Sequence, residues 1–208
     1  MTKKRVIPFR LEARLRRADG ILPVFLPFAG CPYRCMYCAQ DRQTGAGRES
    51  VAGALERLRC DARAWLRRGR VPEVAFYGGT FTALPESDFA ACLDALADVR
   101  AMFSGLEREK GVRVAARCST RPDCCGAERL ERLKEAGVSL VELGVQSFDS
   151  AALQAVRRGY DGETVLEACD AVRGMGLLPG VQLMPGMPGS DAGVFARDVA
   201  AAIAQKPA

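Results

Sequence analysis

The chain has 208 residues, of which 49% are apolar and 26% charged, with a formal net charge of +5. This composition is typical of one globular domain with its own core. No stretch approaches 18 consecutive apolar residues, and the N-terminus lacks the apolar segment of a secretory signal. We therefore expect a cytoplasmic protein with no membrane partner, whose nine cysteines stay reduced. The absence of histidine excludes Ser–His and Cys–His nucleophile pairs and every histidine-containing metal site.

The positive charge is concentrated at the N-terminus. Residues 1–17 carry seven basic side chains against one acidic side chain, a net charge of +6. We therefore divide the chain into a basic arm, residues 1–20, and a core domain, residues 21–208. A basic arm on a nearly neutral body is suited to bind nucleic acid or another polyanion, and a merely solvated terminus explains the pattern equally well.

Beyond the arm, extended and helical patterns alternate. An apolar run over residues 21–29 predicts the first strand, which leads directly into three closely spaced cysteines. Apolar residues at helical spacing over 51–66 predict a helix with Ser50 as its N-cap. The later strands are expected at 74–77, 112–118, 140–145 and 181–184, and the later helices at 85–103, before Gly137, from Asp149, from Glu163 and over 194–203.

Strand–helix alternation with short loops predicts a parallel sheet. The strands lack a clean period of two, which favours burial on both faces of the sheet. The unusual residues all follow strands: the cysteines, Gly-Gly, Arg-Pro-Asp, Gln-Ser and Pro-Gly. Since the carboxyl ends of parallel strands hold the active site in barrels and open sheets, we expect the site at this edge.

The most informative motif is C-x3-C-x2-C, formed by Cys31, Cys35 and Cys38. It supplies three thiolates, whereas all-cysteine iron–sulfur clusters and structural zinc sites normally take four protein ligands. A cluster held this way keeps one metal position open for a cofactor or substrate. The alternatives are ordinary buried thiols, or a zinc site completed by a distant cysteine such as Cys124 or Cys125.

Six segments in chain order resemble the radical S-adenosylmethionine (SAM) enzymes. Within that superfamily, the chain is most similar to proteins related to the Elongator catalytic subunit, and more distantly to oxygen-independent coproporphyrinogen oxidases. The segments that carry the resemblance are FAGCPYRCMYCAQ (28–40), FYGGTFT (76–82), STRPD (119–123), VELGVQSFD (141–149), RRGY (157–160) and GVQLMPGMPG (180–189).

The resemblance implies an α/β fold, a partial (βα) parallel barrel of five to six units. Only five strands are found here, so the core domain is expected to be C-terminally incomplete and to lack the sixth strand. This predicts either a truncated product or a half that needs a partner chain to complete the sheet, because an unpaired strand edge favours association.

The resemblance also implies the cofactors. A 4Fe–4S cluster would be held by Cys31, Cys35 and Cys38, and SAM would bind its fourth iron. Reductive cleavage of SAM would give a 5′-deoxyadenosyl radical that abstracts hydrogen from a substrate, with tRNA as one candidate. The electron donor would be a reductase, a ferredoxin or a flavodoxin. The rival interpretation is a truncated, non-catalytic iron–sulfur or zinc-binding interaction module.

Contacts to SAM are implied at ten positions. Gly78 and Gly79 would let the backbone approach the methionine amino group, beside the Thr80 hydroxyl. Gln146 would bind the ribose hydroxyls, and Arg158, or its neighbour Arg157, would bind the carboxylate. The remaining five are Tyr37, Leu183 and Met184 around the adenine, and Ser119 and Arg121 near the ribose.

Two further observations concern individual residues. The family often has histidine where Tyr160 stands. Four other cysteines fall on apolar helix faces or in a strand and are expected in the core: Cys60, Cys92, Cys118 and Cys169.

Overall fold

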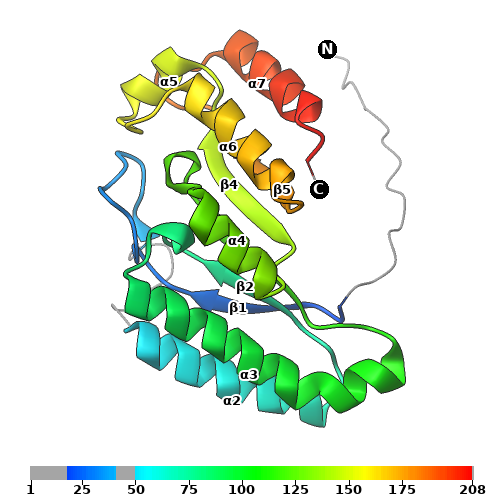
Figure 1. Ribbon diagram of the computed structural model, residues 1–208. Helices are drawn as coiled ribbons and strands as arrows, with labels where there is room; N and C mark the ends of the chain where they lie inside the picture. The colour runs from blue at the N-terminus through cyan, green and yellow to red at the C-terminus, as the bar shows by residue number, and fades with distance from the viewer. Residues whose placement is uncertain (1–17, 41–49, 208) are drawn as a thin grey trace, which may run out of the picture.

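The computed structural model describes residues 18–40 and 50–207, so nearly all of the basic arm falls outside it. A single parallel sheet of five strands, in the order β1-β2-β3-β4-β5, forms the centre of the protein (Figure 1). Among the described helices, none combines the length and apolar character needed to cross a membrane. The predicted α/β fold with a parallel, unclosed sheet is confirmed.

The elements alternate along the chain as the sequence indicates. The strands are β1 (Ile21–Phe25), β2 (Glu73–Tyr77), β3 (Ala115–Thr120), β4 (Leu140–Gln146) and β5 (Leu178–Leu183). The α-helices are α2 (Val51–Arg67), α3 (Glu86–Lys110), α4 (Ala127–Glu135), α5 (Ser150–Ala155), α6 (Gly162–Gly174) and α7 (Ala192–Ala204). Short 3-10 turns, η1 (Phe81–Ala83) and η2 (Pro122–Cys124), follow β2 and β3.

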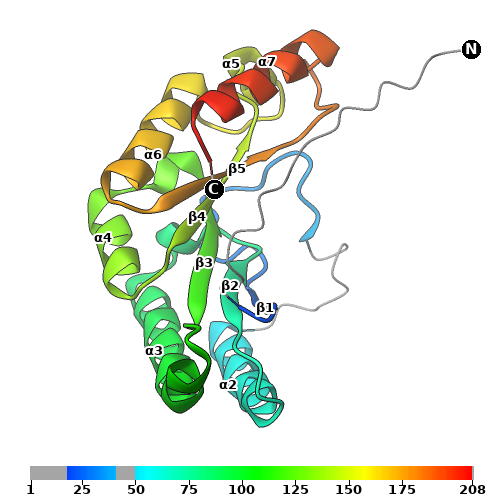
Figure 2. The same ribbon diagram turned by 90° about the vertical axis from the view of Figure 1, so that its right-hand side faces the viewer.

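The helices cover the outer side of the curved sheet and leave its inner side open (Figure 2). Outward-facing side chains such as Phe76, Cys118 and Val141 are almost completely buried beneath these helices. Full burial of a side chain the size of phenylalanine contributes about 2–3 kcal/mol, so this layer forms the core. The carboxyl ends of all five strands meet at one edge, which is where the site residues gather.

The inner face of the sheet differs from the prediction of burial on both faces. β3 alternates strictly between half-buried and buried positions, and β4 does so up to Val145, after which Gln146 is also buried. Arg117 on this face pairs with Glu73 at 2.6 Å and with Glu142 at 3.2 Å. An open barrel leaves room for these charges, because no second layer covers them.

Helix starts follow the expected capping chemistry. The Ser50 hydroxyl accepts from the amide of Gly53 at the start of α2, as predicted. Asp149, Asp161 and Asp191 cap α5, α6 and α7 in the same way. Gly111 ends α3 in the left-handed conformation that glycine adopts without strain.

Several boundaries differ from the sequence prediction. β1 ends at Phe25, because Leu26 begins a turn in which Phe28 takes a positive φ. β5 starts at Leu178, three residues early, despite Pro179 and Gly180. Proline is tolerated here because β5 is an edge strand of the described sheet.

The expectation of a buried position is wrong for Cys60. This residue is exposed on α2, where its sulfur contacts Arg63. Cys92, Cys118 and Cys169 are buried, as expected.

Candidate cofactor site

A cavity of about 490 Å3 lies at the carboxyl ends of the strands. All the predicted site residues except Leu183 line it, whereas Leu183 packs against the core. The lining residues from the prediction are Cys31, Cys35, Cys38, Tyr37, Gly78, Gly79, Thr80, Ser119, Arg121, Gln146, Arg158 and Met184. Residues far apart in the sequence therefore share one chamber.

A larger cavity of about 940 Å3 lies at the opposite end of the sheet. It contains none of the predicted site residues. Its half-buried Arg100 donates to the carbonyls of Val114, Ala136 and Gly137. Because those bonds tie α3 to the start of β3 and the end of α4, we assign this arginine a structural role.

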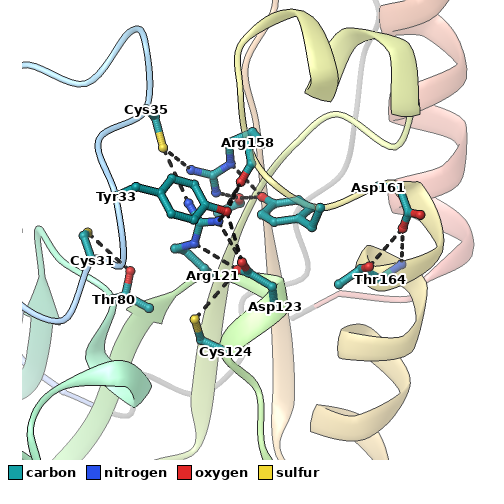
Figure 3. Close-up of polar contacts among 12 residues, drawn as sticks. Cys31, Tyr33, Cys35, Thr80, Arg121, Asp123, Cys124, Arg158, Asp161 and Thr164 are labelled. Atoms are coloured by element: carbon teal, nitrogen blue, oxygen red, sulfur yellow. Dashed lines mark hydrogen bonds and ion pairs between the residues drawn. The ribbon is translucent and has the colours of Figure 1, made fainter.

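The three cysteines sit on the loop that follows β1. The sulfur of Cys31 lies 3.3 Å from the Thr80 hydroxyl, and that of Cys35 lies 3.0 Å from Nη1 of Arg158 (Figure 3). Burial raises the pKa of the Cys38 thiol. Within residues 18–40 and 50–207, no three cysteine or acidic side chains lie close enough together to hold a metal ion. The sulfurs thus share one cavity without forming a closed ligand set. Cys124 and Cys125 are not among the residues that line it.

The Gly-Gly pair after β2 joins this loop to the sheet. The amide of Thr80 donates to the carbonyl of Ala29 at 2.8 Å. A Cβ on Gly79 would lie 2.0 Å from that same carbonyl oxygen, which is an impossible contact. The missing side chain at Gly79 is therefore needed for the two backbones to meet, independently of any ligand.

Two arginines are buried beside Cys35. Arg121 and Arg158 are 4% and 5% exposed, and both donate toward the Cys35 sulfur. Arg121 also makes a two-point contact with the Asp123 carboxylate at 2.9 and 2.8 Å. Among the described residues Arg158 pairs with no carboxylate. The pocket therefore presents excess positive charge, which suits a thiolate or an anionic ligand.

The charge on Arg121 is secured by its neighbours. Burial lowers the pKa of Arg121, but the hydrogen bond and charge of Asp123 outweigh this and hold the pKa above its usual value.

Tyr160 holds the side chain of Arg158 in place. The Tyr160 hydroxyl accepts from Nε of Arg158 at 2.8 Å and donates to the carbonyl of Gly144 at 2.7 Å. Burial raises the pKa of Tyr160 to about 12, so the phenol stays neutral and can donate.

Tyr37 carries a buried hydroxyl that has no hydrogen-bond partner among the described residues. Leaving such a group unpaired costs about 1–3 kcal/mol. Burial also raises its pKa, so the hydroxyl is a donor at neutral pH. An unpaired donor in the wall of the cavity suits a polar ligand.

Gln146 ends β4 at an irregularity in the β4–β5 register. It has a φ of 70°, which is rare outside glycine, and it is 9% exposed. The next residue, Ser147, donates to Asp198 at 2.7 Å, and the amide of Phe148 donates to the other carboxylate oxygen at 2.7 Å. Asp198, on α7, thereby holds the turn that presents Gln146.

Sequence reasoning missed Asp198, Asp123 and Tyr33. The signal for Asp198 was the single acidic residue of a largely apolar helix, at a position that is 2% exposed in the structure. Asp123 was visible in the Arg-Pro-Asp motif but was given no role. Tyr33 lies inside the cysteine motif itself.

An open parallel sheet with three thiols and two buried arginines at its carboxyl edge defines a cofactor-binding α/β protein. Within that class, the family model described as the radical SAM superfamily matches residues 25–197. The chain belongs to the radical SAM superfamily.

Individual relatives refine this assignment. A tRNA uridine(34) acetyltransferase of Dehalococcoides mccartyi is 32% identical over 84% of this chain and 44% of its own length. The acetyltransferase of Methanocaldococcus jannaschii is 37% identical over 57% of this chain and 24% of its own length. The chain therefore spans less than half of either relative.

Solved structures show the same fold. Elp3 of Methanocaldococcus infernus superposes with a TM-score of 0.60 at 23% identity, over 86% of this chain and 41% of its own. Coproporphyrinogen III oxidase of Escherichia coli also gives 0.60, at 18% identity, over 94% of this chain and 44% of its own. The partial barrel is thus shared with radical SAM proteins.

The family implies an iron–sulfur cluster and SAM, and the residues present fit both. Three thiols line one cavity, two guanidinium groups supply positive charge, and the buried Tyr37 hydroxyl has no hydrogen-bond partner among the described residues. Three thiolates can ligate all but one iron of a four-iron cluster, and a guanidinium group can pair with a carboxylate.

Proposed function

We propose that this chain binds a 4Fe–4S cluster through Cys31, Cys35 and Cys38 and binds SAM beside it. The observation that carries this proposal is the shared cavity, in which all three thiols lie with the glycine pair and both buried arginines. When bound and reduced, the cluster supplies the electron that cleaves SAM to methionine and a 5′-deoxyadenosyl radical for hydrogen abstraction.

The protein's own residues bind and orient SAM. Arg158 offers a buried guanidinium to the SAM carboxylate, and Gln146 and Ser119 offer hydrogen bonds to the ribose. The backbone at Gly78 and the Thr80 hydroxyl line the place for the amino group. Tyr37 and Met184 border the adenine. Binding in this cavity would fix the distance between SAM and the substrate.

We further propose a tRNA substrate and a cytoplasmic location. The support is that relatives at 32% and 37% identity are tRNA uridine(34) acetyltransferases. The basic residues at positions 1–17 add a charge suited to phosphate contacts. A reductase, ferredoxin or flavodoxin would supply electrons, and a further strand from a partner would extend the sheet at β5.

Anaerobic reconstitution tests the cofactor proposal. Protein loaded with iron and sulfide, then reduced with dithionite, is expected to convert SAM to 5′-deoxyadenosine. Cys35→Ala should abolish this conversion, whereas Cys60→Ala should not, because Cys60 is exposed and remote from the cavity. Colourless protein that binds zinc, gives no EPR signal after reduction and leaves SAM intact would favour the non-catalytic module.

Salt-dependent binding tests the tRNA proposal. Each phosphate contact lowers the slope of log affinity against log salt by about 0.7 to 0.9. We expect steep weakening with salt for the full chain and a shallower slope after residues 1–17 are deleted. Equal slopes for both proteins would refute a role of the arm.

A further inference from the structure

Tyr33 connects the cysteine loop to the opposite wall of the cavity. It lies between Cys31 and Cys35, and its hydroxyl donates to the carbonyl of Arg158 at 2.6 Å (Figure 3). The same oxygen accepts from Nη2 of Arg121 at 2.5 Å. These partners are 125 and 88 residues away in the sequence, so the contact closes a long loop of chain.

Two further features fit around the Tyr33 side chain. The guanidinium of Arg121 lies over its ring at 4.4 Å, a cation–π geometry. A Cβ on Gly159 would lie 1.8 Å from the Tyr33 hydroxyl oxygen, and Gly159 has a φ of 80°. Position 159 thus leaves the space that the phenol fills. The hydroxyl contacts, the ring contact and this space are three separate observations.

Tyr33 and Cys35 contact the same two arginines, although at Arg158 Tyr33 contacts the backbone carbonyl and Cys35 the guanidinium. Nη1 of Arg121 lies 3.6 Å from the Cys35 sulfur, and Nη1 of Arg158 lies 3.0 Å from it. Any group that fixes both the loop and the arginines therefore fixes the place of this sulfur. Tyr33 belongs to the loop, and its hydroxyl accepts from the Arg121 guanidinium and donates to the backbone carbonyl of Arg158, which Arg121 Nη2 also contacts.

We propose that Tyr33 is a positioning residue that latches the cysteine loop onto Arg121 and Arg158. This inference rests on the proposed cluster site and deepens it. A loop ordered before loading loses less conformational freedom when it ligates a cluster, so the latch slows cluster loss. Removing a residue that hydrogen-bonds to or orients a metal ligand typically lowers metal affinity about 10–100-fold.

A purely structural role predicts a different outcome. Tyr33 is 40% exposed, and Tyr33→Phe keeps the ring while removing only the hydroxyl. We expect thermal unfolding of the apoprotein to be essentially unchanged, since exposed substitutions rarely alter global stability. The effect should be confined to the loop and to the metal.

The test compares iron release from reconstituted protein. We expect Tyr33→Phe to lose iron to a chelator about 10–100-fold faster than the unmodified chain. Met36→Leu is the matched control, because Met36 lies on the same loop, is 58% exposed and does not line the cavity. Equal release rates for Tyr33→Phe and Met36→Leu would overturn the latch.

Two more measurements separate the latch from the cofactor assignment. Hydrogen exchange of the apoprotein should be faster at amides 31–38 in Tyr33→Phe, whether or not a cluster ever binds. Gly159→Ala should produce the same increase, and the double variant should add little, because both changes break one contact. Unchanged exchange would refute the latch even if SAM cleavage succeeds. If the unmodified chain takes up no iron, the proposed function fails while faster exchange still supports the latch.

Discussion

The two halves of the site are held in different ways. The strand-borne half, which includes Arg121 and Gln146, follows directly from β3 and β4, whose hydrogen bonds and buried outer faces fix it. The loop-borne half, residues 28–40, depends on a few side-chain and backbone contacts to Thr80, Arg121 and Arg158. The comparison shows that the sheet orients the groups proposed to bind SAM, whereas single contacts orient the loop that carries the three cysteines.

The largest effect is expected from a substitution that separates the two halves of the site where their backbones meet, at Gly79. Gly79→Ala would place a Cβ 2.0 Å from the carbonyl oxygen of Ala29. We expect a loss of about 3 kcal/mol in the free energy of unfolding, at the upper end of overpacking effects, measured by urea denaturation. Gly105→Ala in α3 is the control, because no atom lies within 4 Å of its added Cβ. That change should stabilise the helix by about 0.5–1 kcal/mol.

The second prediction concerns the strand-borne half of the site alone. Asp198→Ala leaves the Ser147 hydroxyl and the Phe148 amide without their partner, which should cost about 2–3 kcal/mol of unfolding free energy. SAM affinity should fall because Gln146 loses its support, while iron retention should stay near normal. Asp170→Ala, at a site with a 73% exposed side chain, should change stability by less than about 0.5 kcal/mol. Iron loss equal to that of a cysteine variant would contradict the separation of the halves.

Neighbouring arginines offer a narrower comparison. Arg158 lines the cavity with the cysteines, whereas Arg157 lines a different cavity beside α6. Arg158→Gln should weaken SAM binding by about 2 kcal/mol, or roughly 30-fold, by equilibrium titration. Arg157→Gln should leave it nearly unchanged. The reverse result would transfer the carboxylate contact to Arg157.

The smallest expected effect concerns the cap of α7, the helix that carries Asp198. The Val194 amide holds the pKa of Asp191 below its usual value. A lowered folded-state pKa means that the carboxylate stabilises the fold above its unfolded pKa and loses that effect as pH falls through the folded value. Asp191→Ala should therefore lower the melting temperature slightly at pH 7 and converge with the unmodified chain below about pH 3. Asp191→Asn should keep most of the cap but lose the pH dependence.

The sequence was sufficient for the sheet and for most of the cavity. Parallel strands bring their carboxyl ends to one edge, so residues such as Gly79 and Gln146 could be grouped from strand positions alone. Local periodicity does not show which face of a buried strand is exposed to water, so the charged inner face of the sheet at Arg117 was not predicted. It also misplaced Cys60, whose helix position looked apolar.

The remaining features that the sequence did not predict are tertiary contacts between residues far apart in the chain. Asp198 lies 51 residues after Ser147, and Tyr33 lies 125 residues before Arg158. Neither pairing leaves a periodic signal in the chain. The resemblance implied that the backbone around Leu183 lines the adenine site; in the structure Leu183 does not line the cavity, and its side chain packs against the core.

The inner-face ion pairs give the open barrel a gradient of charge along its depth. Near the carboxyl edge of the sheet, Arg121 and Arg158 are countered, among the described residues, by the carboxylate of Asp123; nearer the amino ends of the strands, Arg117 lies between two carboxylates, one of them bonded to Ser119. An anionic group such as phosphate would therefore be attracted to the two arginines at the carboxyl edge and repelled by the two carboxylates around Arg117.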